Sequence, residues 1–334
     1  MNRIIDVSKS TVMVAGGAGF VGSAIVRELI KLDVKVISFD NYLHGVPENV
    51  MGLENVEVVQ GDALSQIDII ETLTKFNVDY IINCIGDTYV PTAYKWPRRF
   101  FDINVGANLN LLEACKICDI RKILYVSSTE VYGITEEEIL DENVSLKPVN
   151  TYAVSKLAAD RLCYTYHLEH QIPVIIARIF NCYGPRESEP YIIPEIIYQL
   201  HRSNVLYLGN IKAERDFTFV NDTARALIKV LCSNVDCGDV VNVGSNTSFS
   251  VEWLAHQIAD IMGINDLEIR QDPERLRACD IDRFRCDNKK LKKVTDWEPE
   301  VEILKGLEMT VDWFRNNGCK WSWENFVRND EMIK

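Results

Sequence analysis

The chain has 334 residues, of which 47% are hydrophobic and 25% are charged, as expected for a globular protein of about two domains. Its 36 basic and 49 acidic residues give a formal net charge of −13. General nucleic-acid binders and proteins that dock on anionic lipid carry basic faces, so this composition argues against both classes. A small anionic ligand remains compatible with it, because a few arginines in a cleft create a local positive field.

The ten cysteines are scattered along the chain, and no apolar run is long enough to span a membrane. The first ten residues lack the apolar segment of a secretory signal. Cys115 and Cys118 form a C-x-x-C pair inside a helical pattern, with no second pair nearby. We therefore expect a cytoplasmic protein with reduced cysteines, no membrane segment and no metal site.

Short β-branched runs alternate with longer helical patterns through the first half of the chain. The predicted strands are 11–15, 34–39, 56–59, 80–84, 122–126 and 173–179. The predicted helices between them include 21–32, 65–76 and 101–118. This alternation predicts an α/β fold, a Rossmann-type doubly wound parallel sheet with helices on both faces.

The pattern changes after Asn181, where prolines cluster and the alternation ends. A short run at 240–243 is predicted to return to the sheet, and 251–262 and 301–314 are predicted amphipathic helices. We expect a Rossmann domain of residues 1–181 plus about 217–247. A smaller, partly interleaved C-terminal domain of residues 182–216 and 248–334 is expected to bind the substrate.

A glycine-rich turn directly follows the first predicted strand. Gly16, Gly19 and Gly22 have the spacing G-x-x-G-x-x-G, and a helix is predicted to begin at Val21. Phe20 and Val21 are further candidate cofactor contacts. Such a turn lets the backbone approach a diphosphate, which the free N–H groups of the helix favour. The segment therefore predicts a dinucleotide site, with a ligand-free flexible turn as the alternative reading.

Acidic residues follow the second and third predicted strands. Asp40 lies 18 residues after Gly22, where a carboxylate accepts hydrogen bonds from ribose hydroxyls. It would repel a 2′-phosphate, and no arginine follows Asn41, so NAD is favoured over NADP. Asp62 and Ala63 are further candidate cofactor contacts, although a turn-capping role explains Asp62 nearly as well.

The reactive candidates follow the fifth predicted strand. Ser128, Thr129 and Glu130 lie at its end, and Tyr152 and Lys156 follow on a predicted helix at positions i and i+4. A nearby ammonium favours a phenolate, so we expect the Tyr152 pKa to be lowered. Such a tyrosine exchanges a proton with a substrate hydroxyl while a nicotinamide takes the hydride.

In combination these motifs resemble the extended short-chain dehydrogenase/reductase superfamily, in its NAD-dependent epimerase/dehydratase group. Arg178–Pro185 and Arg215–Asp222 carry further motifs of that group. The resemblance implies a nucleotide-diphosphate sugar as substrate and a homodimer formed through two long helices. It also implies that Asn104 helps to hold NAD. The substrate candidates that it implies are Thr88, Ser128, Asn181, Arg215 and Arg277.

Glu130 bears on the type of reaction. A glutamate at this position resembles 4,6-dehydratases and UDP-glucuronate decarboxylases, whereas 4-epimerases of the group usually carry a smaller residue. Glu130 is then the candidate base for the C5 proton, with a structural role in the loop as the alternative. Our first hypothesis is a nucleotide-sugar 4,6-dehydratase. A 4-epimerase is the second hypothesis, and a decarboxylase is the third. A non-catalytic NAD-binding sensor is disfavoured by the presence of Tyr152 and Lys156.

Overall fold

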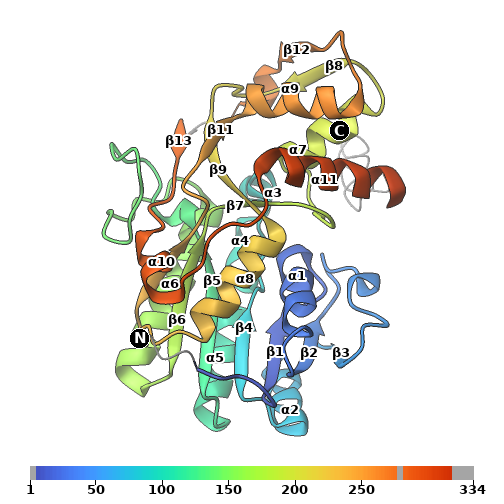
Figure 1. Ribbon diagram of the computed structural model, residues 1–334. Helices are drawn as coiled ribbons and strands as arrows, with labels where there is room; N and C mark the ends of the chain where they lie inside the picture. The colour runs from blue at the N-terminus through green and yellow to red at the C-terminus, as the bar shows by residue number, and fades with distance from the viewer. Residues whose placement is uncertain (1–4, 277–280, 318–334) are drawn as a thin grey trace.

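A computed structural model describes residues 5–276 and 281–317. A parallel sheet forms the lower half of the molecule in Figure 1, in the order β10-β6-β5-β4-β1-β2-β3. Its strands are β1 (Thr11–Ala15), β2 (Lys35–Asp40), β3 (Val56–Gln60), β4 (Tyr80–Asn83), β5 (Lys122–Ser128), β6 (Val174–Ile179) and β10 (Val240–Val243). The doubly wound sheet predicted from the sequence is therefore confirmed, including the return of 240–243 beside β6.

Helices cover both faces of the sheet. One apolar core joins the sheet to α1 (Phe20–Leu29) and α8 (Val220–Leu231). A second core lies on the other face, against α2 (Gln66–Phe76), α5 (Asn108–Ile117) and α6 (Thr151–His170). The central strands β4 and β5 are buried along their whole length, whereas the edge strand β3 is mostly exposed. Burial of both faces explains why the central strands are continuous apolar runs.

The upper part of the molecule in Figure 1 consists of smaller sheets and their helices. Its strands are β7 (Asn181–Tyr183), β8 (Val205–Leu208), β9 (Glu214–Phe219), β11 (Ser248–Ser250), β12 (Glu268–Gln271) and β13 (Arg283–Phe284). Its helices are α7 (Ile192–Leu200), α9 (Val251–Met262) and α11 (Ile303–Asn317). A third apolar core packs these helices against β8 and β9.

Short helices occupy the connections. They are α3 (Val90–Lys95), α4 (Pro97–Phe101), η1 (Pro47–Asn49), η2 (Asp102–Ala107), η3 (Thr129–Val131), η4 (Pro273–Arg275) and α10 (Lys289–Thr295). The single helix predicted over 101–118 is wrong in detail, because its first part is the π-helix η2 and only α5 is regular. Asn104 lies in η2 and makes side-chain hydrogen bonds outside its own helix.

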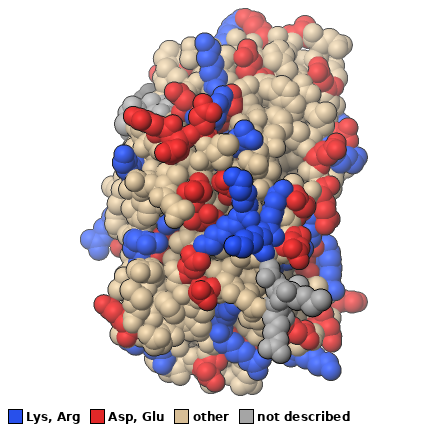
Figure 2. Space-filling model, turned by 60° about the vertical axis from the view of Figure 1, so that its left-hand side comes forward, with Lys and Arg blue, Asp and Glu red and all other residues tan. Residues whose placement is uncertain are grey.

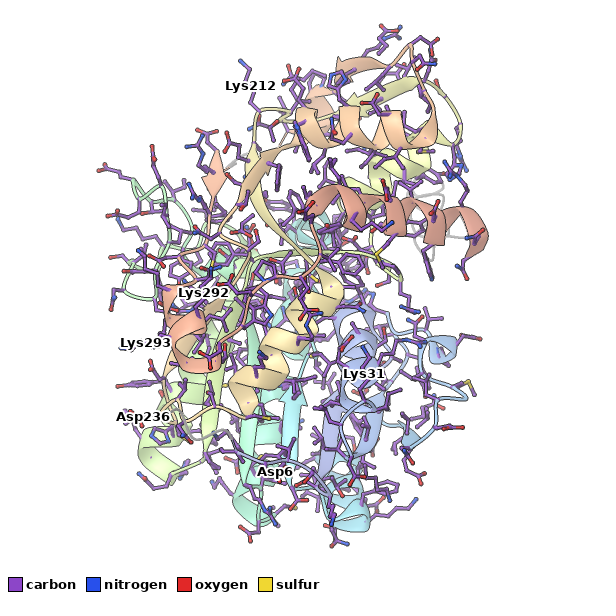
Figure 3. The ribbon with its side chains drawn as sticks, in the orientation of Figure 1. Asp6, Lys31, Lys212, Asp236, Lys292 and Lys293 are labelled. Atoms are coloured by element: carbon purple, nitrogen blue, oxygen red, sulfur yellow. The ribbon has the colours of Figure 1, made fainter. Side chains whose placement is uncertain are left out.

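On the face of the molecule in Figure 2, acidic and basic side chains are interspersed. The labelled Lys212 extends outward from the upper part of the molecule in Figure 3. Even the lysine-rich helix α10 is locally paired: Lys290 contacts Asp239 at 2.7 Å, and Lys292 contacts Glu298 at 2.7 Å. None of the helices in the described ranges has the length and apolar character that a membrane span requires.

Candidate active site

The glycine turn joins β1 to α1 at the carboxyl end of the sheet. Gly16 has a φ of 78°, a left-handed conformation that glycine adopts without strain. A Cβ atom at Gly22 would overlap the carbonyl oxygen of Gly16, so only glycine allows α1 to pack this closely on the turn. The turn is held by the amide of Gly16, which donates to the Phe39 carbonyl at 2.8 Å. The first turn of α1 thus faces the end of the sheet, where a phosphate group would approach its N–H groups.

Asp40, the last residue of β2, contacts this turn. Its carboxylate accepts the amides of Ala18 at 3.0 Å and Tyr42 at 2.8 Å, and only 8% of the residue is exposed. Burial raises the pKa of Asp40, and the two amide hydrogen bonds partly offset that shift. The backbone around Asp40 is close-packed, because a Cβ on Gly45 would lie 2.7 Å from the carboxylate oxygens. The carboxylate is therefore fixed in direction before any ligand arrives.

A cavity of about 300 Å³ lies beside the glycine turn. Its lining combines the glycines, the acidic strand ends and apolar walls: Gly16, Gly19, Phe39, Asp40, Asn41, Leu43, His44, Gly45, Gly61, Asp62, Ala63, Leu64, Cys84, Ile85, Gly86, Ile103 and Ala107. Apolar walls on either side of a carboxylate suit an adenosine, whose flat base is apolar and whose ribose carries hydroxyl groups. The residues present therefore fit NAD, the ligand predicted from the glycine spacing.

The remaining cofactor candidates have local roles as well. The Asp62 carboxylate lines the cavity and also accepts the Leu64 amide at 2.9 Å, so both readings of this residue are compatible with the structure. The Asn104 side chain accepts the Asp87 amide at 2.7 Å and donates to the Ser155 hydroxyl at 2.8 Å. Asn104 thus fixes the loop after β4 against α6, which positions the cavity wall from behind.

The reactive residues converge where β5 ends and α6 begins. Ser128 is the last residue of β5, and its hydroxyl accepts the amide of Glu130 at 3.2 Å. Tyr152 is the second residue of α6, and the Ser128 hydroxyl lies close enough to act on the phenol and lower its pKa. Glu130 lies close enough for its charge to act on the Tyr152 hydroxyl. The structure therefore brings together a hydroxyl, a phenol and a carboxylate from segments more than 20 residues apart.

Lys156 lies one helical turn beyond Tyr152 and is almost fully buried. Its ammonium donates to the Val126 carbonyl at 2.7 Å and lies 4.5 Å from the centre of the Tyr125 ring. Burial lowers the Lys156 pKa to about 8. The side chain is consequently poised to lose its proton near neutral pH, unlike a surface lysine.

The expectation that the Tyr152 pKa is lowered is wrong for this structure. Burial of the phenol raises its pKa, and the carboxylates of Glu130 and Asp87 raise it further. The Ser128 hydroxyl lowers the pKa and is the second-largest influence, larger than either carboxylate but smaller than burial. The i, i+4 spacing with Lys156 did not reveal the desolvation of the phenol or the two nearby carboxylates.

The predicted substrate residues come from both parts of the molecule: Thr88 follows β4 and Ser128 ends β5 of the large sheet, whereas Asn181 and Arg215 lie on strands of the upper part. Asn181 begins β7 and pairs with Phe217 of β9, so it adjoins the strand that carries Arg215. Thr88 shares a hydrogen bond of 2.5 Å with the hydroxyl of Tyr191, across the two halves of the molecule. Arg277 lies outside the described residues.

Arg215 is positioned by its neighbours on β9. Its guanidinium donates to the Glu214 carbonyl at 2.8 Å and lies 5.4 Å from the centre of the Phe284 ring. The next residue, Asp216, is fully buried and accepts the amides of Ser245, Asn246 and Cys286. The aspartate of this motif is therefore a structural staple for the strand, and the arginine remains the candidate ligand.

Sequence reasoning missed a polar cluster that joins the two halves. His44 contacts Glu189 at 3.0 Å through Nδ1, and Arg99 contacts Nε2 of the same ring at 2.8 Å. Because arginine only donates, Nε2 is the acceptor and Nδ1 carries the proton in this arrangement. Arg99 also pairs with the buried Asp87 at 2.8 Å. The four side chains come from separate segments of the chain, so no local sequence pattern predicts the cluster.

Comparison with known proteins agrees with this geometry. Residues 12–244 match the NAD dependent epimerase/dehydratase family. GDP-6-deoxy-D-mannose reductase of Pseudomonas aeruginosa is 37% identical over 261 residues, which cover 75% of this chain and 82% of the relative. The dTDP-D-glucose 4,6-dehydratase of Mus musculus is 27% identical over 321 residues, which cover 93% and 90% of the two chains.

Solved structures show the same fold. The dTDP-glucose 4,6-dehydratase DesIV of Streptomyces venezuelae, solved with NAD, matches with a TM-score of 0.87 and 26% identity, covering 93% of this chain and 99% of that one. The UDP-N-acetylglucosamine 4-epimerase of Methanobrevibacter ruminantium matches with a TM-score of 0.83 and 30% identity, covering 93% and 100%. With its glycine turn, its fixed Asp40 and these relatives, the chain belongs to the NAD-dependent epimerase/dehydratase family of extended short-chain dehydrogenases/reductases, and its cofactor is NAD.

Proposed function

We propose that the protein is a nucleotide-sugar 4,6-dehydratase. The observation that carries this proposal is a second ionisable group near the reactive centre: the charge of the Glu130 carboxylate acts on the Tyr152 hydroxyl, and the Asn150 amide donates to that carboxylate at 3.1 Å. A 4-epimerase needs only the phenol and the Ser128 hydroxyl. A carboxylate within reach of the same sugar provides the base that removal of a C5 proton requires.

The proposed reaction begins with Tyr152 taking the proton of the C4 hydroxyl while C4 is oxidised to a ketone. When bound, NAD supplies the reversible hydride acceptor and a positively charged ring near the phenol. Because burial raises the Tyr152 pKa, this step requires positive charge near the phenol, and we propose that the Lys156 ammonium, one helical turn away, supplies part of it. Ser128, whose hydroxyl acts on the Tyr152 phenol, is proposed to orient the reacting hydroxyl of the sugar.

Elimination then depends on Glu130. The C4 ketone acidifies the C5 proton, Glu130 removes it, and the C6 hydroxyl leaves as water. The adjacent Thr129 has no carboxyl group, so we propose that Glu130 or solvent supplies the proton to the departing hydroxyl. A proton added to C5 from solvent, together with the hydride that the bound cofactor would supply to C6, gives a 4-keto-6-deoxy sugar.

The upper part of the molecule, residues 182–216 and 248–317, is proposed to bind the nucleotide diphosphate. Asn181 and Arg215 are the candidate diphosphate ligands, because an arginine fork matches phosphate oxygens. Both lie on adjoining strands, Asn181 on β7 and Arg215 on β9. We also propose a homodimer through α5 and α6, which is supported by exposed apolar side chains at Ile117, Tyr164 and Leu168.

A 4-epimerase is the second candidate, supported by the Tyr152–Ser128 pair and by the epimerase structure of the same fold. Product analysis separates the two functions. The purified protein is incubated with NAD and with UDP-, dTDP-, GDP- and CDP-glucose in deuterated water, and the products are analysed by NMR. A 4-keto-6-deoxy product with deuterium at C5 is the expected result. Inversion at C4 with an unchanged C6 hydroxyl would replace the dehydratase by the epimerase.

Glu130→Gln tests the assigned base in the same assay. This variant is expected to oxidise C4, seen as absorbance of the reduced nicotinamide, while water loss falls by about 100-fold or more. Retention of full dehydration by the variant would show that Glu130 is not the base. A reductase, the activity named for the Pseudomonas aeruginosa relative, would instead consume reduced cofactor with a 4-keto sugar and leave water loss undetected.

A further inference from the structure

Asn150 occupies the position directly before α6 and uses both ends of its carboxamide. The oxygen accepts the amide of Ala153 at 2.8 Å, which caps the helix. The nitrogen donates to Oε2 of Glu130 at 3.1 Å. Only 8% of Asn150 is exposed, so both bonds are shielded from competing water.

Capping alone does not explain an asparagine at this position. Serine and aspartate cap helices about as well. Serine, however, lacks an amide donor that reaches beyond the helix, and aspartate would face Glu130 with a second negative charge. Only a carboxamide accepts from the helix and donates to a carboxylate at the same time. The residue type therefore matches the second contact as well as the first.

The contact links α6 to the segment that follows β5. Tyr152 lies two residues after Asn150 on α6, and the Ser128 hydroxyl lies close enough to act on its phenol. Ser128 accepts the backbone amide of Glu130 at 3.2 Å, and the Glu130 carboxylate returns to Asn150. Within residues 5–276 and 281–317, no other side chain is seen to hydrogen-bond that carboxylate. The direction of the carboxylate is thus tied to the helix that carries the phenol.

We propose that Asn150 is a positioning residue that aims the Glu130 carboxylate at the C5 proton while its capping bond holds Tyr152 in place. This inference rests on the proposed dehydratase function. The two contacts of Asn150, both at the start of α6, serve different steps of the proposed reaction. Oxidation at C4 depends on the capping bond, because that bond positions the phenol, whereas removal of the C5 proton depends on the amide donor.

Asn150→Ser breaks one bond and retains the other, because serine still caps α6. In the NAD-loaded full chain, with UDP-, dTDP-, GDP- and CDP-glucose as probes, we expect C4 oxidation within about threefold of the wild-type rate. Deuterium incorporation at C5 and water loss are expected to fall by about 10- to 100-fold, as for a misplaced catalytic group. KM should change little, and reduced nicotinamide should accumulate, which a merely structural change would not cause.

Two further variants separate positioning from stability. Ser250→Ala removes the cap of α9, a helix of the upper part, where the hydroxyl accepts the Trp253 amide at 3.1 Å. It should lower the melting temperature without accumulating reduced nicotinamide. In a double-mutant cycle, Asn150→Ser should cause no further loss of dehydration in the Glu130→Gln background, since the partner of the amide is already neutral.

The outcomes distinguish the inference from the function on which it rests. If the wild-type protein forms no 4-keto-6-deoxy product from any probe, the proposed function and this inference both fall. If the wild type dehydrates and Asn150→Ser dehydrates equally fast, the inference alone is overturned. If Asn150→Ser slows C4 oxidation and water loss by the same factor, Asn150 is only a helix cap and the inference is again overturned.

Discussion

The glycine turn and the reactive cluster lie at the same end of the sheet but are built by different means. The turn is made of backbone: Gly16 and Gly22 allow a close approach, and amides of the turn meet the Asp40 carboxylate. The cluster is made of side chains that meet across long sequence separations, such as Asn150 with Glu130. A site made of backbone depends on the space that each residue leaves for close approach. A site made of side chains depends on the hydrogen-bond partners that orient each group.

This difference predicts separable failures. Damage to the turn should weaken cofactor binding and leave the chemistry intact once the cofactor is bound. Damage to the cluster should stop the chemistry and leave cofactor binding intact. The three tests below start with the largest expected effect. A turn variant that loses the chemistry with cofactor bound, or a cluster variant that loses cofactor binding, would contradict the comparison.

Tyr152→Phe should give the largest effect, a fall of about 100- to 10,000-fold in C4 oxidation, the usual contribution of a general acid–base group. The buried ring keeps its packing against Phe100, with ring centres 6.3 Å apart, so the fold should be retained. Stopped-flow absorbance of reduced nicotinamide measures the rate, and calorimetric titration measures NAD affinity. A variant that loses NAD affinity as severely as activity would contradict the proposed division of labour.

Gly22→Ala should act on the other region. Its Cβ would overlap the Gly16 carbonyl oxygen, so α1 has to move away from the turn, at a cost of about 1–3 kcal/mol in stability. NAD affinity should fall about tenfold or more, while saturating NAD should restore most of the turnover. The control is Gly52→Ala, at a φ of 76° with no atom within 4 Å of the added Cβ, which should cost stability and spare NAD binding. Equal NAD affinities in the two variants would refute the argument.

The smallest of the three effects is a pH dependence set by Lys156. Its pKa is lowered to about 8, so the ammonium is present below that pH and lost above it. C4 oxidation should therefore decline about tenfold per unit on the alkaline side, with NAD saturating. The profile of Lys156→Arg, whose guanidinium stays charged, should lack this limb although its rate is lower. A wild-type rate that stays constant to pH 10 would rule out a role for the ammonium.

Much of the fold followed from local sequence patterns. Each predicted strand of the large sheet lies within one or two residues of an observed strand, because parallel strands buried on both faces are continuous apolar runs. The π-helix η2 was not foreseen, since its apolar spacing resembles that of an ordinary helix. Within this π-helix, Asn104 bonds to Asp87 and Ser155, two residues outside the segment that its own sequence does not indicate.

The sequence by itself determined those features of the protein whose geometry is set within one short segment. The G-x-x-G-x-x-G turn, Asp40 at a strand end and the i, i+4 spacing of Tyr152 and Lys156 all belong to this class, because their geometry follows from local backbone conformation. Only the tertiary structure decided the environment of the reactive groups. Three features depend on which distant segments pack together. They are the burial of Tyr152, the hydrogen bond from Asn150 to Glu130 and the polar cluster around His44. Burial and hydrogen bonding act through space, and no spacing along the chain records them.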